Sequence, residues 1–157
     1  MSPTGSVARR PVLRDGILHA DLCIIGAGSG GLSVAAGAVQ MGASVVLIEK
    51  HLMGGDCLNT GCVPSKALLA AAHAAHAQRY ADAFGIASHE PAVDFAKVHQ
   101  HVHGVIATIA PHDSVERFEG LGVTVIQAQA SFSGPAEVQA GSHRIWARRF
   151  VVATGSS

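Results

Sequence analysis

The sequence is poor in charged and aromatic residues, and each shortage excludes a class of partner. Charged residues make up 14% of the 157 positions, and the formal net charge is zero. Binders of nucleic acid or of membrane surfaces need clustered excess Lys and Arg, so we expect neither partner. Aromatic residues reach only 4%, which argues against a surface on which nucleic-acid bases stack.

Long apolar runs and cysteines are scarce as well. No apolar run approaches the roughly 20 residues that a membrane span needs. Residues 1–19 hold three arginines but lack the apolar segment of a secretory signal. Three cysteines do not make the disulfide framework of a small secreted protein. We therefore expect a cytoplasmic protein, in which a close cysteine pair is catalytic or metal-binding.

The hydrophobic residues, at 48% of the sequence, suffice for one domain with a core. Residues 1–19 are polar with scattered Pro and Gly, and they predict a flexible leader. Ala20–Ile25 and Ser44–Ile48 are short and apolar throughout, which is typical of buried parallel strands. Leu32–Met41 lies between them and reads as a helix ended by Gly42. The pattern predicts an α/β, Rossmann-like fold over residues 20–157.

The rest of the chain predicts helices followed by short strands. Residues 65–84 are rich in Ala and Leu and predict a helix ended by Gly85. Residues 95–121 give a second helical pattern, which Pro111 should kink or break. Glycine-containing turns then separate short runs, which favours an antiparallel β-meander beside the parallel sheet. The predicted strands are Val123–Ile126, Ala130–Ser133, Glu137–Ala140, Ile145–Ala147 and Phe150–Ala153.

A Gly-x-Gly-x-x-Gly fingerprint joins the first predicted strand to the first helix. Gly26 permits the turn, Gly28 lets the backbone approach a pyrophosphate, and Gly31 lets helix and strand pack closely. The helix N-terminus offers free N–H groups to the phosphates. Glu49 ends the second strand 18 residues after Gly31, close to the ~20 expected for an acid that binds ribose hydroxyls. The alternative is a glycine-rich turn in an unrelated α/β protein.

Cys57 and Cys62 lie five positions apart. In a regular helix they would be separated by ~7.5 Å along the axis, beyond the ~6.8 Å that a disulfide tolerates between Cα atoms. If they are bridged, Cys57 lies in a loop or distorted turn and Cys62 near a helix start, where a thiolate is stabilised. Gly61 would let a flat ring approach, and Lys66 would bring a positive charge. A zinc site is the alternative, although its cysteines are usually two to four residues apart with four ligands in all.

The run Gly54–Lys66 (Gly-Gly-Asp-Cys-Leu-Asn-Thr-Gly-Cys-Val-Pro-Ser-Lys) is similar to the active-site signature of the class I pyridine nucleotide-disulfide oxidoreductases. These FAD-dependent homodimers include dihydrolipoamide dehydrogenase, glutathione reductase and mercuric reductase. The glycine fingerprint, Glu49 and Ala153–Ser156 fall where that family contacts FAD, so the resemblance covers residues 20–157. Ala71–His76 and residues 109–123 most resemble the mercuric reductase-like branch.

The resemblance implies a redox-active disulfide between Cys57 and Cys62. Cys57 would be the thiol that exchanges with substrate, Cys62 the thiol nearest the flavin, and Lys66 would lie at the reactive flavin edge. Electrons would pass from NAD(P)H to FAD, then to the disulfide and the substrate. The implied FAD contacts are Gly26, Gly28, Ser29, Gly30, Gly31, Glu49, Lys50, Gly55, Asp56, Cys57, Cys62, Lys66, Ala128, Ala153, Thr154, Gly155 and Ser156.

Enzymes of that family are much longer than this chain, so the resemblance implies the N-terminal part of one. The NAD(P)H domain, the rest of the FAD domain and the dimerisation domain are not among these residues. We therefore expect the chain alone to show no NAD(P)H-dependent turnover and to bind FAD weakly. A small molecule, a disulfide or a mercuric ion is the implied substrate class. The alternatives are a stand-alone nucleotide-binding or interaction module, and a thiol/His metal-binding protein.

The remaining cysteine and the histidines have simpler interpretations. Cys23 lies among apolar strand residues and is expected to be an inert buried thiol. His99 and His103, four residues apart on a predicted helix, have the spacing of a zinc or nickel pair. In this Ala-rich region we interpret them as solvated or helix-packing residues and predict no metal site.

Overall fold

The structure, a computed structural model, describes residues 9–156. This part of the chain forms two compact units. One unit contains the residues up to Gly55 and those from Pro111 onward, and the other is Asp56–Ala110. The first eight residues of the predicted leader lie outside the described residues.

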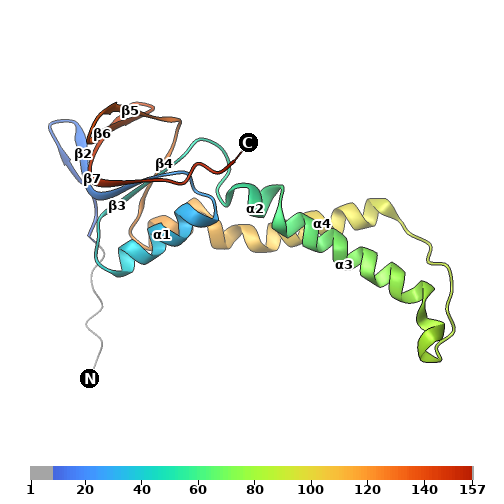
Figure 1. Cartoon of the computed structure of the whole chain (residues 1–157). Helices are drawn as coiled ribbons and strands as arrows, with labels where there is room; N and C mark the ends of the chain where they lie inside the picture. The colour runs from blue at the N-terminus through green and yellow to red at the C-terminus, as the bar shows by residue number, and fades with distance from the viewer. Residues whose placement is uncertain (1–8, 157) are drawn as a thin grey trace, which may run out of the picture. The chain divides into compact units, whose positions relative to one another are not determined.

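The first unit is built on a seven-stranded sheet with the order β4-β3-β2-β7-β6-β5, and with β1 paired to β2 (Figure 1). The neighbours from β4 to β7 are parallel, whereas β7, β6 and β5 are antiparallel. The predicted α/β fold with a parallel sheet and a meander is therefore confirmed. The strands are β1 (Val12–Arg14), β2 (Ile17–Ile25), β3 (Val45–Glu49), β4 (Thr124–Gln127), β5 (Ala130–Gly134), β6 (Glu137–Ala140) and β7 (His143–Val152).

Both faces of the central strands are buried, which explains their continuous apolar runs. All five residues of β3 are buried, and their side chains alternate between two core clusters. The first cluster lies against helices α1 (Ser29–Gln40) and α5 (Val115–Gly120), and the second against the meander. The first contains Ile24, Leu32, Ala35, Val45, Leu47 and Phe118; the second contains Cys23, Val46, Ile48, Val138 and Ile145.

The N-terminal segment differs from the prediction. Residues 12–19, predicted as part of a flexible leader, form an antiparallel hairpin in which Val12 pairs with His19. Asp15 and Gly16 make the turn with positive φ angles of 48° and 76°. Asp-Gly between apolar runs favours a tight hairpin because both turn residues tolerate that conformation, and the prediction overlooked this signal.

Strand β7 is longer than predicted. Ile145–Ala147 and Phe150–Ala153 were expected as separate strands, but one strand runs from His143 to Val152. It pairs in parallel with β2 from Arg144 opposite Ile17 to Val152 opposite Ile25. The intervening arginines are exposed, so the strand continues through them without burying charge.

The second unit consists mainly of two long helices, α3 (Cys62–Arg79) and α4 (Phe95–Ile109), which lie side by side (Figure 1). The short helix α2 (Gly55–Asn59) precedes α3, and the 3₁₀ turn η1 (Ala81–Phe84) follows it. Helix α3 therefore begins three residues before the predicted Ser65, and its expected last turn is 3₁₀. Among the described helices, none combines the length and apolarity needed to cross a membrane.

The helical pattern breaks at Pro111, as predicted. Helix α4 ends at Ile109, the 3₁₀ turn η2 (Ala110–Asp113) follows, and α5 begins at Val115. The Ser114 side chain caps α5 by accepting a hydrogen bond from the backbone N–H of Arg117.

A part-buried hydrogen-bond network links Asp21 in β2 to Ser44, the residue before β3. The Asp21 carboxylate accepts hydrogen bonds from the Ser44 backbone N–H at 3.0 Å and the Ser44 hydroxyl at 2.9 Å. In return, the Ser44 hydroxyl accepts from the Asp21 backbone N–H at 2.9 Å. The pKa of the Asp21 carboxyl is lowered, mainly by the hydrogen bond from the Ser44 backbone. The hydrogen bonds from the Ser44 hydroxyl and from Arg148 lower it further. The ionised carboxylate therefore stabilises this junction.

We predict that Asp21→Asn lowers the free energy of unfolding at neutral pH by about 1–2 kcal/mol, because charge-assisted hydrogen bonds are lost. The stabilisation is full above the pKa of the unfolded carboxyl and is lost as the pH falls through the lower folded pKa. The difference in unfolding free energy between the native protein and the variant should therefore become smaller at acid pH. Urea denaturation at several pH values measures it.

Asp15→Asn is the matched control, since it removes the same charge at the hairpin turn, where Asn also tolerates a positive φ. It should change the unfolding free energy by less than about 0.5 kcal/mol. An Asp21→Asn variant whose deficit is constant from neutral to acid pH would contradict the assigned role of the carboxylate.

Candidate functional site

The loop between β2 and α1 contains no side chain larger than a methyl group and packs directly on neighbouring backbone. Gly26 has a φ of 106°, and a Cβ there would lie 2.2 Å from the carbonyl oxygen of Ala153. A Cβ on Gly31 would lie 1.9 Å from the carbonyl oxygen of Gly26. The predicted turn at Gly26 and the close helix packing at Gly31 are both confirmed. We call Gly26–Gly31 the glycine loop.

The N-terminus of α1 is open. Gly28 is the N-cap residue and supplies no side-chain hydrogen bond to the first turn of this twelve-residue helix. Ser29 and Gly30 are exposed, and a Cβ on Gly30 would meet no atom within 4 Å. The first-turn N–H groups and the positive end of the helix dipole can therefore bind an anionic ligand.

Glu49 holds the glycine loop against the end of β3. Its carboxylate accepts hydrogen bonds from the Ala27 backbone N–H at 2.6 Å and the His51 backbone N–H at 2.8 Å. Its backbone carbonyl accepts from the Ala128 N–H at 2.9 Å. An ionised carboxylate has about four acceptor positions, so the two backbone hydrogen bonds leave capacity for ligand hydroxyls.

A cavity of about 160 Å³ opens beside Glu49, at the carboxyl ends of the parallel strands. Five predicted FAD contacts line it, namely Gly26, Glu49, Lys50, Ala128 and Thr154. Ile25, Ile48, Gln129 and Ala130 also line it and were not predicted. Their positions at the ends of the strands could have identified them in the sequence, because open α/β sheets bind ligands at the carboxyl edge.

The other predicted contacts of the first unit gather around the same loop. The Gly54 N–H donates to the Ala27 carbonyl at 2.9 Å. A Cβ on Gly55 would lie 2.7 Å from the Cα of Gly28, so this second glycine pair also permits backbone contact. Ala153 donates its N–H to the Ile25 carbonyl at 2.8 Å. Gly155 and Ser156 follow and are exposed.

Asp56, Cys57, Cys62 and Lys66 belong to the second unit. Cys62 is the first residue of α3, so its predicted place at a helix start is confirmed. Cys57 lies in the short helix α2 and not in the predicted loop or distorted turn, because α2 and α3 are two separate helices and the pair need not share one. Gly61 separates the two helices, and a Cβ there would lie 2.9 Å from the carbonyl oxygen of Asp56. Glycine is therefore needed at position 61 for the close turn itself.

Cys57 and Cys62 are both free thiols in the structure; Cys57 is half-buried and Cys62 exposed. The hydrogen bond between the Cys57 thiol and Cys62 is the main cause that raises the pKa of Cys57. The positive charge of Lys66 acts in the opposite direction and is a smaller influence. The interaction with Cys62 thus disfavours ionisation of the Cys57 thiol.

The remaining cysteine and the histidine pair lie apart from these groups in the sequence. Cys23 is fully buried, and burial raises its pKa to about 12, which confirms a buried thiol. The Nε2 atoms of His99 and His103 are 3.1 Å apart. Within residues 9–156, no group of three or more His, Cys, Asp or Glu side chains is placed to hold a metal ion.

Comparison with known proteins finds a matching family and several similar proteins. Residues 20–157 match the family described as pyridine nucleotide-disulphide oxidoreductase. A dihydrolipoyl dehydrogenase from Thermus scotoductus is 35% identical over 136 residues, covering 87% of this chain and 29% of that protein. A mercuric reductase from Streptomyces lividans is 37% identical over 143 residues, covering 87% and 30%. The chain therefore spans less than a third of the length of these relatives.

A solved structure has the same fold. The HOCl-induced flavoprotein disulfide reductase RclA from Escherichia coli, determined as a Cu(II) complex, superposes with a TM-score of 0.70 at 24% identity. The match covers 87% of this chain and 28% of that one.

We predict that Gly31→Ala destabilises the protein by about 3 kcal/mol or more, because the added methyl group meets backbone that cannot move independently. Gly30→Ala is the matched control one residue away, where the space is open. It should be neutral or stabilising by up to about 1 kcal/mol, as expected for Gly to Ala in a helix. Denaturant titration measures both, and equal effects would contradict the packing described for the loop.

We also predict that Cys62→Ala lowers the pKa of Cys57, because the hydrogen bond that raises it is removed. The thiolate is the form that reacts with iodoacetamide, so the pH midpoint of Cys57 alkylation should shift downward. Mass spectrometry of peptides locates the label. Cys23 should stay unlabelled until the protein unfolds.

Cys23→Ala is the control for this experiment, because it removes a thiol without touching the pair. It should not change the pH midpoint of Cys57 alkylation. A midpoint that stays unchanged or rises in Cys62→Ala would show that the two thiols do not interact as described.

Proposed function

Because the chain belongs to the pyridine nucleotide-disulphide oxidoreductase family, we propose that it forms the FAD-binding, thiol-bearing part of a disulfide oxidoreductase. In that enzyme electrons would pass from NAD(P)H to FAD, to the Cys57–Cys62 pair and then to substrate. The observation that carries the proposal is the glycine loop, whose open helix end and adjoining carboxylate are suited to a dinucleotide.

The residues at the loop fit the adenosine and pyrophosphate part of FAD. The N–H groups of Ser29 and Gly30 would bind the phosphates, and Glu49 would accept the ribose hydroxyls. Lys50 and Ala128 line the adjoining cavity, where the adenosine end would lie. The cavity, at about 160 Å³, is smaller than the roughly 300–1,000 Å³ of whole ligand sites, so the remainder of FAD would extend beyond it.

Other residues are assigned to the flavin part by similarity to the family. Ala153–Ser156 would close over the nucleotide, and Gly55 and Asp56 would approach it from the segment before α3. Cys62 would be the sulfur that faces the flavin, with Lys66 at its reactive edge. When bound, FAD would supply two-electron chemistry between a nicotinamide and a thiol pair.

The thiol pair itself would carry out disulfide exchange. The Cys57 thiolate would attack a substrate disulfide, form a mixed disulfide and release one thiol. Cys62 would then attack the Cys57 sulfur, release the second thiol and leave the Cys57–Cys62 disulfide, a transfer of two electrons and two protons in all. Because the pKa of Cys57 is raised, the first attack needs a base or an alkaline pH.

The identity of the substrate and the properties of the whole enzyme go beyond these residues. Relatives named for dihydrolipoyl groups and for mercuric ion are 35% and 37% identical, so overall identity does not select between the two substrates. We propose a homodimeric cytoplasmic enzyme whose NAD(P)H site lies outside this chain. The sequence holds one glycine fingerprint of the dinucleotide type, and the 157-residue chain alone should therefore not turn over NAD(P)H.

The test is a flavin spectrum of the chain loaded with FAD. Reduction by dithiothreitol should add long-wavelength absorbance from a thiolate beside the flavin. Cys62→Ser should abolish that band, whereas Cys57→Ser should keep it, because only Cys62 is assigned to face the flavin. FAD binding without thiol-dependent absorbance would instead favour a nucleotide-binding module without turnover.

A further inference from the structure

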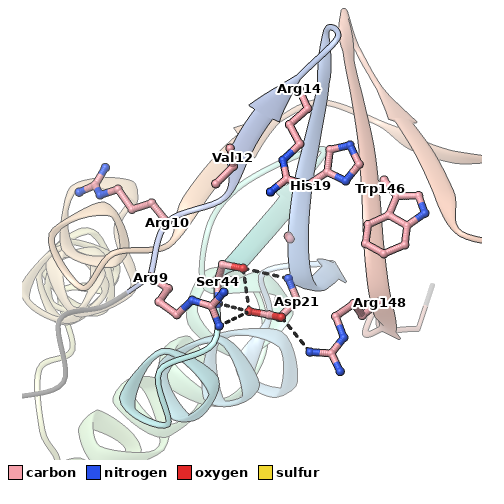
Figure 2. A pocket seen from close by; sticks show the side chains of 10 residues that line it. Arg9, Arg10, Val12, Arg14, His19, Asp21, Ser44, Trp146 and Arg148 are labelled. Atoms are coloured by element: carbon pink, nitrogen blue, oxygen red, sulfur yellow. Dashed lines mark hydrogen bonds and ion pairs between the residues drawn. The ribbon is translucent and has the colours of Figure 1, made fainter.

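A second cavity, of about 350 Å³, lies at the β1–β2 hairpin (Figure 2). Residues from β1, β2 and β7 surround it, together with the segment before β1 and the residue before β3. They are Arg9, Arg10, Val12, Arg14, His19, Ala20, Asp21, Ser44, Trp146 and Arg148. Nothing in the dinucleotide site uses this cavity.

The cavity concentrates positive charge in a protein whose formal net charge is zero. Four of the 11 Lys and Arg residues line it, and Asp21 is the only acid among the lining residues. The guanidinium groups of Arg9 and Arg148 converge on the Asp21 carboxylate, at 3.8 Å and 3.2 Å (Figure 2). Four guanidinium groups against one carboxylate leave an excess charge of +3.

Asp21 does not neutralise the remaining arginines. The Arg14 side chain has no hydrogen-bond or ion-pair partner within residues 9–156. In the described part of the chain, the one hydrogen bond of the Arg10 side chain is to the backbone carbonyl of Glu119, at 3.5 Å. Among the described residues, neither Arg10 nor Arg14 has a carboxylate partner. The lining therefore carries positive charge that Asp21 does not balance, and it is suited to a ligand with several negative charges.

One wall of the cavity is aromatic. The rings of His19 and Trp146 lie with centroids 5.2 Å apart, and Trp146 is 37% exposed. His19 pairs with Trp146 in the sheet, whereas Ile25 pairs with Val152 next to the glycine loop. Six residues along a strand span roughly 20 Å, so a ligand beside Trp146 would not overlap one at the glycine loop.

We propose that this cavity is a second ligand site, which binds a small phosphorylated molecule. Guanidinium groups match phosphate oxygens with paired hydrogen bonds. The volume lies within the roughly 300–1,000 Å³ typical of small-ligand sites. A phosphate group carries more charge than a single carboxylate and so better matches the excess charge. The site is independent of the function proposed for the glycine loop.

Trp146 is the single tryptophan of the chain, so its fluorescence reports on this cavity. Inorganic pyrophosphate added to the full chain should change that fluorescence saturably. Arg14→Gln should weaken binding about tenfold, as expected for one charge-assisted contact. Because the Arg14 side chain makes no hydrogen bond or ion pair within residues 9–156, the fold should be unaffected. Arg148→Gln offers a second variant with the same expected direction.

Arg149→Gln is the matched control. Arg149 is exposed, lies next to Arg148 and does not line the cavity. Its loss should weaken binding less than about twofold, because water and salt screen an exposed charge that does not touch the ligand. A further comparison of AMP with ribose 5-phosphate, again followed at Trp146, separates two ligand sources. Tighter binding of AMP identifies a nucleotide, and equal binding identifies a phosphate compound without a stacking ring.

Two results would overturn the proposal. One is the absence of a saturable Trp146 response to pyrophosphate. The other is an equal loss of affinity in Arg14→Gln and Arg149→Gln, which would mean that the anion responds to net charge and not to the cavity. Glu49→Gln, at the glycine loop, should leave the Trp146 response unchanged, so a failure of the dinucleotide site and a failure of this site are distinguishable.

Discussion

The glycine loop depends on close contact between backbone segments. Gly26 lies against Ala153, Gly31 against Gly26, and Gly55 against Gly28, each at a separation that leaves no room for a methyl group. Within the loop, Ala27 is the one apolar side chain that packs into the core, so most of the loop is held through its backbone. The Glu49 carboxylate supplies the missing connection through its hydrogen bonds to Ala27 and His51, and so fixes the loop at the carboxyl edge of the sheet.

Strand β2 links this edge to the rest of the first unit. It pairs with β3 on one side and along its whole length with β7 on the other. Its carboxyl end leads into the glycine loop, and its earlier residues His19 and Asp21 line the basic cavity. Strand β2 is held by hydrogen bonds along its length. The glycine loop, next to the Glu49 carboxylate, and the arginine-lined cavity therefore lie at separate positions along the same strand.

Much of this arrangement follows from the sequence, for identifiable reasons. The short apolar runs around the glycine fingerprint predicted β2, α1 and β3, because strands buried on both faces must be apolar throughout. The break at Pro111 and the place of Cys62 at a helix start followed from local stereochemistry. The β1–β2 hairpin was missed although Asp15-Gly16 is a local signal for its turn. The continuity of β7 did not follow, since it depends on pairing with β2 over a long stretch. The gathering of Arg9, Arg14 and Arg148 also depends on that pairing, because the residues are far apart in the sequence.

The central claim is that the glycine loop binds FAD, and an amide NMR titration tests it most directly. At 16.0 kDa the chain is small enough for backbone amides to be followed one by one, and weak binding is visible as well as tight binding. If the glycine loop binds FAD, the amide signals of Ser29, Gly30 and Gly31 should shift most, together with those of Lys50 and Ala128. Saturating FAD that leaves these five signals unchanged, or shifts only signals elsewhere, would contradict it.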